Sequence, residues 1–308
     1  MAPAPVLVTP ASVALVGPGA IGSFFAAQLG RAGRVHLTVC ARTPFETLTV
    51  ASEAWGETVR ISPTVVTSVE ELAAGPVDWV LLSTKAHQTA GTAPWLERLC
   101  ADSTTVVVLQ NGVEHIARVR PLVPDRVTIL PAVVHCGAEL QAPGRVVHRS
   151  NGYMVVAREP PGCGQRFGEL FEPDREIVRL TDDFVTEAWK KLCTNVAVNG
   201  ITALTERRLD VLGDPAVRRV ASALLDECIG VARASGARVE PAFADDVLER
   251  TRALPATAGT SMLYDRLAGR SLESDAIYGA VVRAGRRFGV PTPATDQMLA
   301  LLGAIQPA

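Results

Sequence analysis

The segment "SVALVGPGAIGSFFAAQLGRAG" near the start of the sequence narrows the possible folds more than any other. The apolar run Val13–Val16 predicts a buried strand, and the apolar spacing after Gly22 predicts a helix. Between them, Gly17, Gly19 and Gly22 have the G-x-G-x-x-G spacing of a dinucleotide-binding loop. Such a loop needs a tight turn, close backbone approach to a pyrophosphate and close helix–strand packing, followed by a helix N-terminus that favours anions. The segment therefore predicts a Rossmann-type unit that binds a dinucleotide.

Further strands follow this unit in the pattern of a doubly wound parallel sheet. "VHLTVCAR", "PVDWVLLSTK" and "STTVVVLQNG" read as short apolar strands, with a helix over "TAGTAPWLERLC" between the last two. Ligands of such sheets lie beyond the carboxyl ends of the strands. We therefore expect Gly17, Arg42, Lys85 and Asn111, which follow four of these strands, to lie on one rim.

The pattern changes twice toward the C-terminus. From about Val127, "RVTILPAVV", "GRVVHRS" and "YMVVARE" predict strands joined by turns with an antiparallel portion, followed by a helix over Cys163–Phe171 and the strand "EIVRLTDD". After Asp183 the apolar spacing is helical to the end, including a final strong helix from about Ser271 to Gly289. The predicted domains are a Rossmann-type α/β unit over 1–182 and an all-helical unit over 183–308.

Composition excludes several classes of partner. A formal net charge of −2 over 308 residues gives no general attraction to nucleic acid or anionic membranes, and no apolar run is long enough for a transmembrane helix. The opening "MAPAPVLVTP" reads as a flexible tail, because it lacks the basic start of a signal peptide. The six cysteines show no CxxC pair and no metal-ligand spacing, which predicts reduced thiols in a cytoplasmic protein without a metal.

The dinucleotide is predicted to be NADP (NADPH) rather than NAD. An NAD site places an acidic residue near the end of the second strand, whereas this sequence has "CART" there and no Asp or Glu before Glu46. Arg42 takes that place and suits a 2′-phosphate through charge-assisted hydrogen bonds. The alternative is that Arg42 is an ordinary surface arginine.

The stretch "EAWKKLCTNVAVNGITAL" carries the most chemistry. Of the 30 basic residues only Lys85, Lys190 and Lys191 are lysines, and a lysine can give up a proton where an arginine cannot. In one helix over 187–204, Lys191, Asn195 and Asn199 have i, i+4, i+8 spacing and form a stripe on one face. Lys190 points about 100° away. The stripe predicts the polar lining of a cleft, although the asparagines could instead bond to neighbouring loops.

These motifs together resemble the ketopantoate reductases (2-dehydropantoate 2-reductases) over nearly the whole chain. The resemblance is carried by "GPGAIG", "LLSTKAHQT", "LQNGVE", "AWKKLCTNVAVNGITAL", "GTSMLYDRLAGRSLESDAIYGAVV" and "GVPTPATDQMLALL", in that order. It implies a Rossmann domain followed by an all-helical domain, with the active site in the cleft between them. The implied activity is NADPH-dependent reduction of 2-dehydropantoate to pantoate, in pantothenate biosynthesis.

The resemblance also implies residue roles. Lys191 matches the proton donor to the substrate carbonyl oxygen, and Glu273 matches a glutamate near the lysine and the cofactor, although an acid in a first helical turn also has a purely structural role. The residues expected to bind the substrate are Asn195, Asn199 and Ser261. Those expected to bind the cofactor are Gly17, Pro18, Gly19, Ala20, Ile21, Gly22, Arg42, Lys85, Asn111, Gly137 and Glu273. Hydride delivery builds negative charge on the ketone oxygen, which an ammonium group stabilises and protonates.

Departures from the family pattern leave the substrate open. Ala258 replaces an asparagine, Thr260 replaces the first serine of "SSM", "NPLTA" reads "NGITA", and a polar position falls on Leu209 or Arg208. The expected partner is a small 2-oxo acid, and a homodimer is possible. The alternatives are a reductase of another branched 2-oxo acid or ketone, and a non-enzymatic NADP-binding sensor, which would need only the glycine loop and Arg42.

Overall fold

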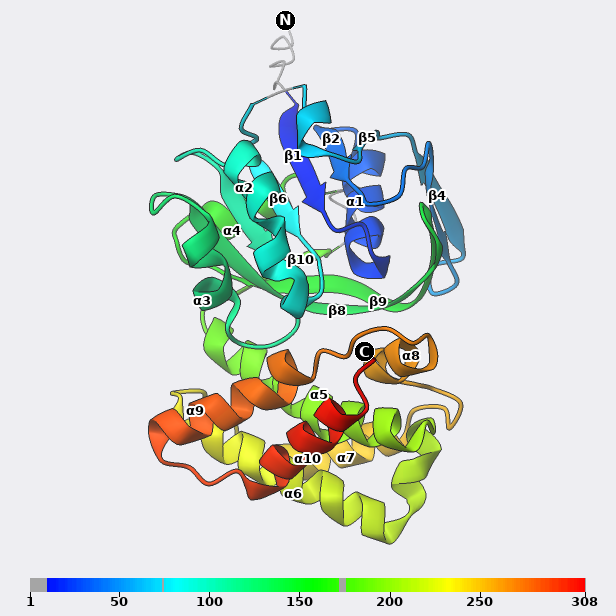
Figure 1. Ribbon diagram of the computed structural model, residues 1–308, viewed down its shortest axis with the longest axis vertical. Coiled ribbons are helices and arrows are strands. Elements are labelled where there is room, and N and C mark those ends of the chain that lie inside the picture. Colours follow the sequence, from blue (N-terminus) through cyan, green and yellow to red (C-terminus); the bar gives the residue numbers. More distant parts are fainter. Residues whose placement is uncertain (1–9, 74, 172–175, 308) are drawn as a thin grey trace, which may run out of the picture. The chain divides into compact units, whose positions relative to one another are not determined.

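The computed structural model describes residues 10–73, 75–171 and 176–307. The tail expected at the N-terminus lies almost wholly outside these residues. The chain divides into two compact units, one formed by Met1–Gln110 with His115–Asp182 and the other by Asn111–Glu114 with Asp183–Ala308. Asn111–Glu114 therefore groups with the second unit although it lies far from it in sequence. Figure 1 shows the elements of both units, each of which is described by itself.

The first unit is built on a sheet whose centre is parallel. Its strands lie in the order β5-β2-β1-β6-β7-β8 with every pair parallel. Their bounds are β1 Ala11–Val16, β2 Val35–Cys40, β5 Thr64–Val66, β6 Trp79–Leu82, β7 Thr105–Val108 and β8 Thr128–Ala142. The strands predicted over β1, β2, β6, β7 and β8 occur in the predicted order, and the chain reverses its direction of winding at β1, as in a doubly wound sheet.

Helices cover both faces of this sheet because each central strand is apolar on both sides. Val13 and Leu15 pack into the core that contains α1 (Ala20–Ala32), whereas Ala14 and Val16 pack into the core on the other face. That second core contains residues of α2 (Ala93–Leu99), which follows the 3-10 helix η2 (Ala86–Thr92). Phe24, Phe25 and Leu29 of α1 are fully buried, as their spacing predicts.

A long antiparallel hairpin extends the sheet beyond β7. β8 pairs with β9 (Arg145–Ala157), and β9 also pairs in parallel with β3 and β10 (Val178–Thr181). The predicted antiparallel portion is thus present, but two strands were predicted where β9 is one. Its two halves are separated only by an irregularity at Asn151 and Gly152, where positive φ angles of 56° and 130° shift the register. The helix expected after β9 is the shorter α4 (Cys163–Gly168).

The sequence reasoning missed the elements between β2 and β6. β3 (Leu48–Ser52) and β4 (Glu57–Ile61) form an antiparallel hairpin, and β5 follows directly. The sequence signals that could have found the hairpin are the spacing of Leu48 and Val50 two residues apart and the turn residue Gly56. In the structure β3 has alternating burial, and Gly56 has a φ of 65°. The 3-10 helices η1 (Val69–Glu71) and η3 (Arg120–Leu122) and the short α3 (His115–Val119) complete this unit.

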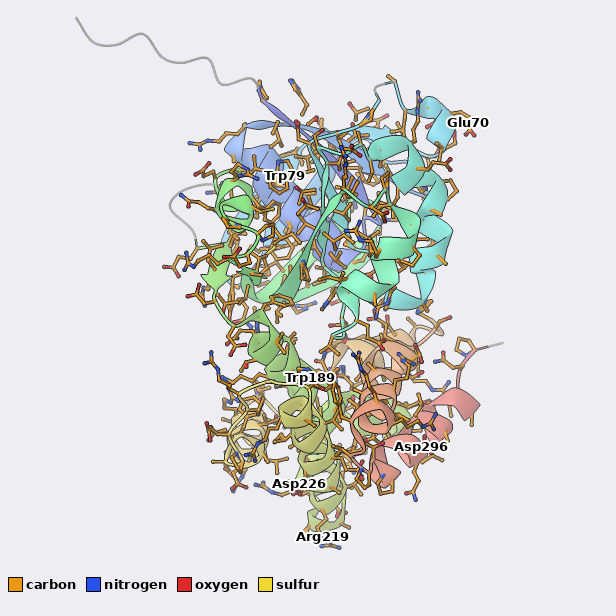
Figure 2. All side chains as sticks on the ribbon, turned by 90° about the vertical axis from the view of Figure 1, so that its left-hand side faces the viewer. Glu70, Trp79, Trp189, Arg219, Asp226 and Asp296 are labelled. Carbon is orange, nitrogen blue, oxygen red and sulfur yellow. The ribbon has the colours of Figure 1, made fainter. Side chains whose placement is uncertain are left out.

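The second unit is helical throughout its described residues. Its elements are α5 Phe184–Thr205, η4 Leu209–Gly213, α6 Pro215–Ala234, α7 Phe243–Arg252, α8 Ser261–Leu267, η5 Asp275–Gly279, α9 Ala280–Phe288 and α10 Pro293–Ala304. One apolar core joins α5, α6, α7, α9 and α10. Side chains fill both units densely in Figure 2, where Trp79 marks the sheet unit and Trp189 marks α5. No described helix is long and apolar enough to cross a membrane.

Two predicted helices differ in detail from the structure. The helix predicted over 187–204 begins three residues earlier, because Asp183 accepts a hydrogen bond from the Thr186 N–H and caps it. The final strong helix begins at Ser274 instead of about Ser271, and its first turns, η5, are π-helical. It ends at Gly289, whose φ is 70°, as predicted.

Candidate functional site

The glycine loop joins β1 to α1 with the backbone that its sequence requires. Gly17 has a φ of 91°, a conformation that favours glycine. A Cβ at Gly22 would come within 2.8 Å of both the Gly17 carbonyl oxygen and a Leu15 methyl carbon, so this position must stay small for the helix to pack. A Cβ at Gly19 would meet nothing within 4 Å. Gly17 and Gly22 are therefore closely packed against neighbouring atoms, whereas the space beside Gly19 is open, so a ligand can approach the backbone there.

Two residues after β6 hold this loop in place, and sequence reasoning missed both. The Ser83 hydroxyl donates a 2.5 Å hydrogen bond to the Gly17 carbonyl, and Thr84 fills the space beside the Gly17 Cα. Gln110 in turn donates to the Thr84 hydroxyl at 3.1 Å. The signal available in the sequence was their position directly after a buried strand, on the same rim as the glycines.

The helix α1 offers an N-terminus suited to an anion. Gly19 is its N-cap and supplies no side-chain cap, and the first turn contains no acidic residue. The first turn follows Pro18 and contains Ala20, Ile21 and Gly22. The unpaired backbone N–H groups of a helical first turn, together with the positive end of the helix dipole, favour phosphate oxygens. Phosphate oxygens are therefore the groups that this helix N-terminus favours, and the space beside Gly19 is open.

The rim of the parallel strands carries two of the predicted cofactor residues. Arg42 follows β2 and is exposed, and Lys85 follows β6 and is half-buried. Because β2, β1 and β6 are parallel neighbours, these residues and the glycine loop follow the same ends of their strands. Asn111 follows β7 but groups with the second unit. Gly137 lies within β8 opposite Ser150, and a Cβ there would clash with the Ser150 hydroxyl. That contact gives Gly137 a structural role.

The helix α5 places Lys191, Asn195 and Asn199 on one face, since it is continuous from Phe184 to Thr205. Lys190, Lys191 and Asn195 are half-buried. Asn199 is 3% exposed, and its Nδ2 has no hydrogen-bond partner. Leaving such a buried amide nitrogen without a partner costs about 1–3 kcal/mol, so Asn199 keeps the capacity to donate one further hydrogen bond.

A chain of hydrogen bonds joins three of the predicted site residues within the second unit. Asn111 Nδ2 donates to Glu273 Oε2 at 3.0 Å, and Asn195 Nδ2 lies 3.5 Å from Asn111 Oδ1. Glu273 is only 7% exposed. The Asn111 segment is held by Glu114, which forms a two-oxygen ion pair with Arg283 of α9 at 2.7 and 3.0 Å. The helical unit therefore assembles a polar cluster from three separate stretches of sequence.

The positions that depart from the family pattern lie together near the start of α8. The Thr260 hydroxyl accepts from the Leu263 N–H at 3.1 Å and lies 2.7 Å from the Thr202 hydroxyl. Thr260 is therefore the N-cap of α8, whereas Ser261 beside it is exposed. The Leu209 N–H donates to the Ala258 carbonyl at 3.0 Å, and Leu209 is buried in the apolar core.

Because Leu209 is buried, Arg208 is the polar side chain at the position where the family pattern has a polar residue. It reaches the Thr257 carbonyl at 2.7 Å and the Tyr264 hydroxyl at 3.3 Å. Among the described residues, no group of three His, Cys, Asp or Glu side chains could hold a metal ion.

Comparison with known proteins identifies both units. The family model described as "Ketopantoate reductase PanE/ApbA" matches residues 13–160, and "Ketopantoate reductase PanE/ApbA C terminal" matches residues 183–306. A 2-dehydropantoate 2-reductase of Caulobacter vibrioides is 41% identical over 95% of this chain and 98% of its own. One of Mycobacterium tuberculosis is 40% identical over 95% of this chain and 97% of its own. The structure of a dimeric ketopantoate reductase of Staphylococcus aureus is 25% identical with a TM-score of 0.84, and covers 96% of this chain and 98% of its own.

Proposed function

Because the chain belongs to the ketopantoate reductase family and is an oxidoreductase, we propose that it reduces 2-dehydropantoate to pantoate with NADPH, as a step of pantothenate biosynthesis. The observation that carries the proposal is the buried, unpartnered amide of Asn199 on the helical face of Lys191. A protein that only sensed NADP would have no use for this amide, since the glycine loop and Arg42 would suffice for the nucleotide.

The cofactor is proposed to bind the first unit through the glycine loop. The backbone of Gly17–Gly22 and the first turn of α1 hold the pyrophosphate, and Ser83 keeps the loop in the shape that accepts it. Arg42 pairs with the 2′-phosphate. Lys85 and Asn111 are proposed to lie on the nicotinamide side. Glu273 and Gly137 are proposed as further cofactor-binding residues, Gly137 in addition to its structural contact with Ser150. The cofactor supplies a hydride to the substrate carbonyl carbon when it is bound.

The helical unit is proposed to supply the proton and to orient the substrate. The Lys191 ammonium lies near the carbonyl oxygen, stabilises the negative charge that develops there and donates its proton. Glu273 provides the counter-charge, and the hydrogen bond from Asn111 fixes one of its carboxylate oxygens. Asn195 and Asn199 donate to substrate oxygens, and Ser261 contacts the substrate carboxylate.

Purified protein incubated with NADPH and a panel of 2-oxo acids tests the proposal. We expect 2-dehydropantoate to give the highest kcat/KM and NADPH to be preferred over NADH. A higher kcat/KM for another branched 2-oxo acid would replace the proposed substrate, and the region of Ala258, Leu209 and Arg208 would be its first explanation. Nucleotide binding without turnover of any 2-oxo acid would favour the sensor and contradict the proposed activity.

Two properties of the assembly are proposed with the activity. The S. aureus relative is described as dimeric, so we propose a homodimer, for which light scattering should give twice the 32.6 kDa of one chain. All six cysteines lie within the described residues, and none of them is joined in a disulfide. Cysteines that form no disulfide suit a reducing compartment, which supports the proposal of a cytoplasmic location.

A further inference from the structure

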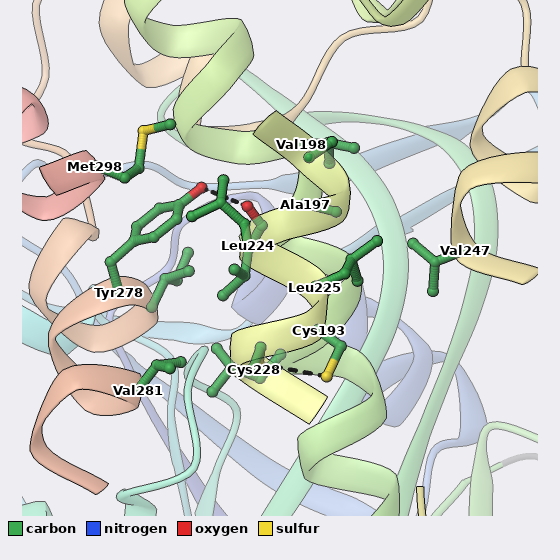
Figure 3. Close-up of a cluster of buried hydrophobic side chains, with 14 of the residues drawn as sticks. Cys193, Ala197, Val198, Leu224, Leu225, Cys228, Val247, Tyr278, Val281 and Met298 are labelled. Carbon is green, nitrogen blue, oxygen red and sulfur yellow. Dashed lines mark hydrogen bonds between the residues drawn. The ribbon is translucent and has the colours of Figure 1, made fainter. Parts of the chain in front are cut away.

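Tyr278 makes an unusual contact with α5, at the point where the asparagine stripe lies. Its hydroxyl donates to the Val196 carbonyl at 2.9 Å and accepts from the Gly200 N–H at 2.6 Å. In a regular α-helix these two backbone groups, four residues apart, pair with each other. The Tyr278 hydroxyl thus bonds to both members of a pair of backbone groups that belong to one helical turn. Figure 3 shows the Tyr278 ring lying against α5 beside Met298.

The contact is built to stay in place. Tyr278 is fully buried and comes from η5, the π-helical stretch Asp275–Gly279, which is an irregularity often found at functional sites. Burial raises the pKa of its phenol well above the usual value, so the hydroxyl keeps its proton and its ability to donate. A Cβ on Gly200 would come within 2.6 Å of the hydroxyl and 2.7 Å of Met298 Sδ. Glycine at position 200 is therefore needed for the hydroxyl to reach the helix backbone.

The place of the contact decides what it can control. A side chain that hydrogen-bonds to two backbone groups of one helical turn holds the local backbone at that point. Asn199 lies between the two bridged groups, Val196 and Gly200, whereas Lys191 lies a full turn before them. The direction of the Asn199 amide relative to Lys191 thus depends on the local backbone that Tyr278 sets. Glu273 begins the segment that leads into η5, so the same segment carries the proposed counter-charge and the tyrosine.

We infer that Tyr278 is a positioning residue for the substrate site: its hydroxyl, bridging Val196 and Gly200, aims the buried Asn199 amide at the substrate. The inference rests on the proposed reduction of a 2-oxo acid. Tyr278 does not touch the substrate and acts only through the backbone of α5. Its loss should therefore weaken substrate binding and leave cofactor binding in the first unit unchanged.

The test compares Tyr278→Phe with the wild type and with Val247→Ala. Val247 lies on α7 in the same apolar core and is 2% exposed, so its truncation lowers stability without altering the Val196–Gly200 bridge. For Tyr278→Phe we expect KM for the 2-oxo acid to rise about tenfold or more, the order of one misaligned hydrogen bond to substrate. We expect kcat to fall less than KM rises, and the Kd for NADPH to stay within about twofold of wild type. Val247→Ala should keep the wild-type KM.

The possible outcomes separate the two proposals. An active wild type whose KM is unchanged in Tyr278→Phe, or is raised equally by Val247→Ala, would overturn the positioning role and leave the proposed function standing. A wild type that reduces no 2-oxo acid would overturn the proposed function, and the positioning role would fall with it. A rise in KM confined to Tyr278→Phe would support both.

Discussion

The substitution Gly200→Ala tests how closely Tyr278 packs against α5, because close packing predicts that it lowers the free energy of unfolding, whereas helix propensity alone predicts that it raises it. In an ordinary helix interior, alanine is more favourable than glycine by about 1 kcal/mol. At position 200 the new methyl group would lie 2.6 Å from the Tyr278 hydroxyl, 2.9 Å from Tyr278 Cζ and 2.7 Å from Met298 Sδ. Both neighbours are held in the core, since Tyr278 is fully buried and Met298 is 6% exposed.

Two unfavourable effects oppose the gain in helix propensity. Overpacking a filled core costs about 1–3 kcal/mol. Displacing the hydroxyl leaves buried backbone or phenol groups without partners, which costs a further 1–3 kcal/mol or so. The net expectation is a destabilisation of about 3 kcal/mol, a large part of the roughly 5–15 kcal/mol that stabilises a typical protein.

Urea and thermal unfolding followed by circular dichroism measure the effect. The matched control is Gly230→Ala, in the interior of α6, where a new Cβ would meet only a Val290 methyl carbon at 3.5 Å. Gly230→Ala should be neutral or more stable than wild type by up to about 1 kcal/mol, as helix propensity alone predicts. If Gly200→Ala were as stable as Gly230→Ala, the close approach of Tyr278 to α5 would be refuted.

Three further predictions concern the cofactor, the buried amide and acid stability. Arg42→Asp should lower the ratio of kcat/KM for NADPH to that for NADH by about tenfold or more, because it removes the partner of a 2′-phosphate and adds a repelling charge; an unchanged ratio would mean that Arg42 is an ordinary surface residue. Asn199→Leu should raise KM for the 2-oxo acid while stability stays level or rises by about 1 kcal/mol in urea unfolding, since an unpartnered buried amide is removed; a large loss of stability would show that the amide is structural. Burial lowers the pKa of His115 in the folded protein from 6.5 to about 4. As the pH falls below 6.5, the unfolded chain therefore takes up a proton at His115 before the folded protein does. The free energy of unfolding is unaffected by His115 above pH 6.5 and decreases as the pH falls from 6.5 toward 4. Between pH 7 and 5, the free energy of unfolding of His115→Gln should decrease less steeply than that of wild type, by roughly 1.4 kcal/mol per pH unit below 6.5. Parallel curves of unfolding free energy against pH would contradict the lowered pKa of His115.

The sequence predicted the parallel core of the first unit because local signals there agree with the tertiary structure. The apolar strands, the glycine spacing and the apolar face of Phe24 to Leu29 each predict the same arrangement, a doubly wound sheet with a helix packed on it. The edge strands were missed or divided because their pairing is decided by distant partners. β3 pairs with β9 nearly a hundred residues away, and β9 continues through Asn151 and Gly152 where the local sequence indicates a turn.

The arrangement of the candidate site residues was predicted in part, for the same reason. Helical periodicity alone placed Lys191, Asn195 and Asn199 on one face, and α5 has that form. It could not show that Asn111 would join Glu273, because the Glu114–Arg283 ion pair that holds this segment links residues 169 apart in sequence. Nor could it explain the glycine in "NGITA". That residue makes sense only once Tyr278 is known to approach the helix at this position.

The central claim is that Lys191 donates the proton, and the neighbouring Lys190 provides the matched control. Both are half-buried lysines on α5, but only Lys191 shares the face of Asn195 and Asn199. Single-turnover NADPH oxidation with saturating 2-oxo acid should fall about 10²–10⁴-fold in Lys191→Ala, the usual contribution of a general acid, and should stay within about threefold of wild type in Lys190→Ala. Equal rates in the two variants, or an unaffected Lys191→Ala, would contradict the mechanism.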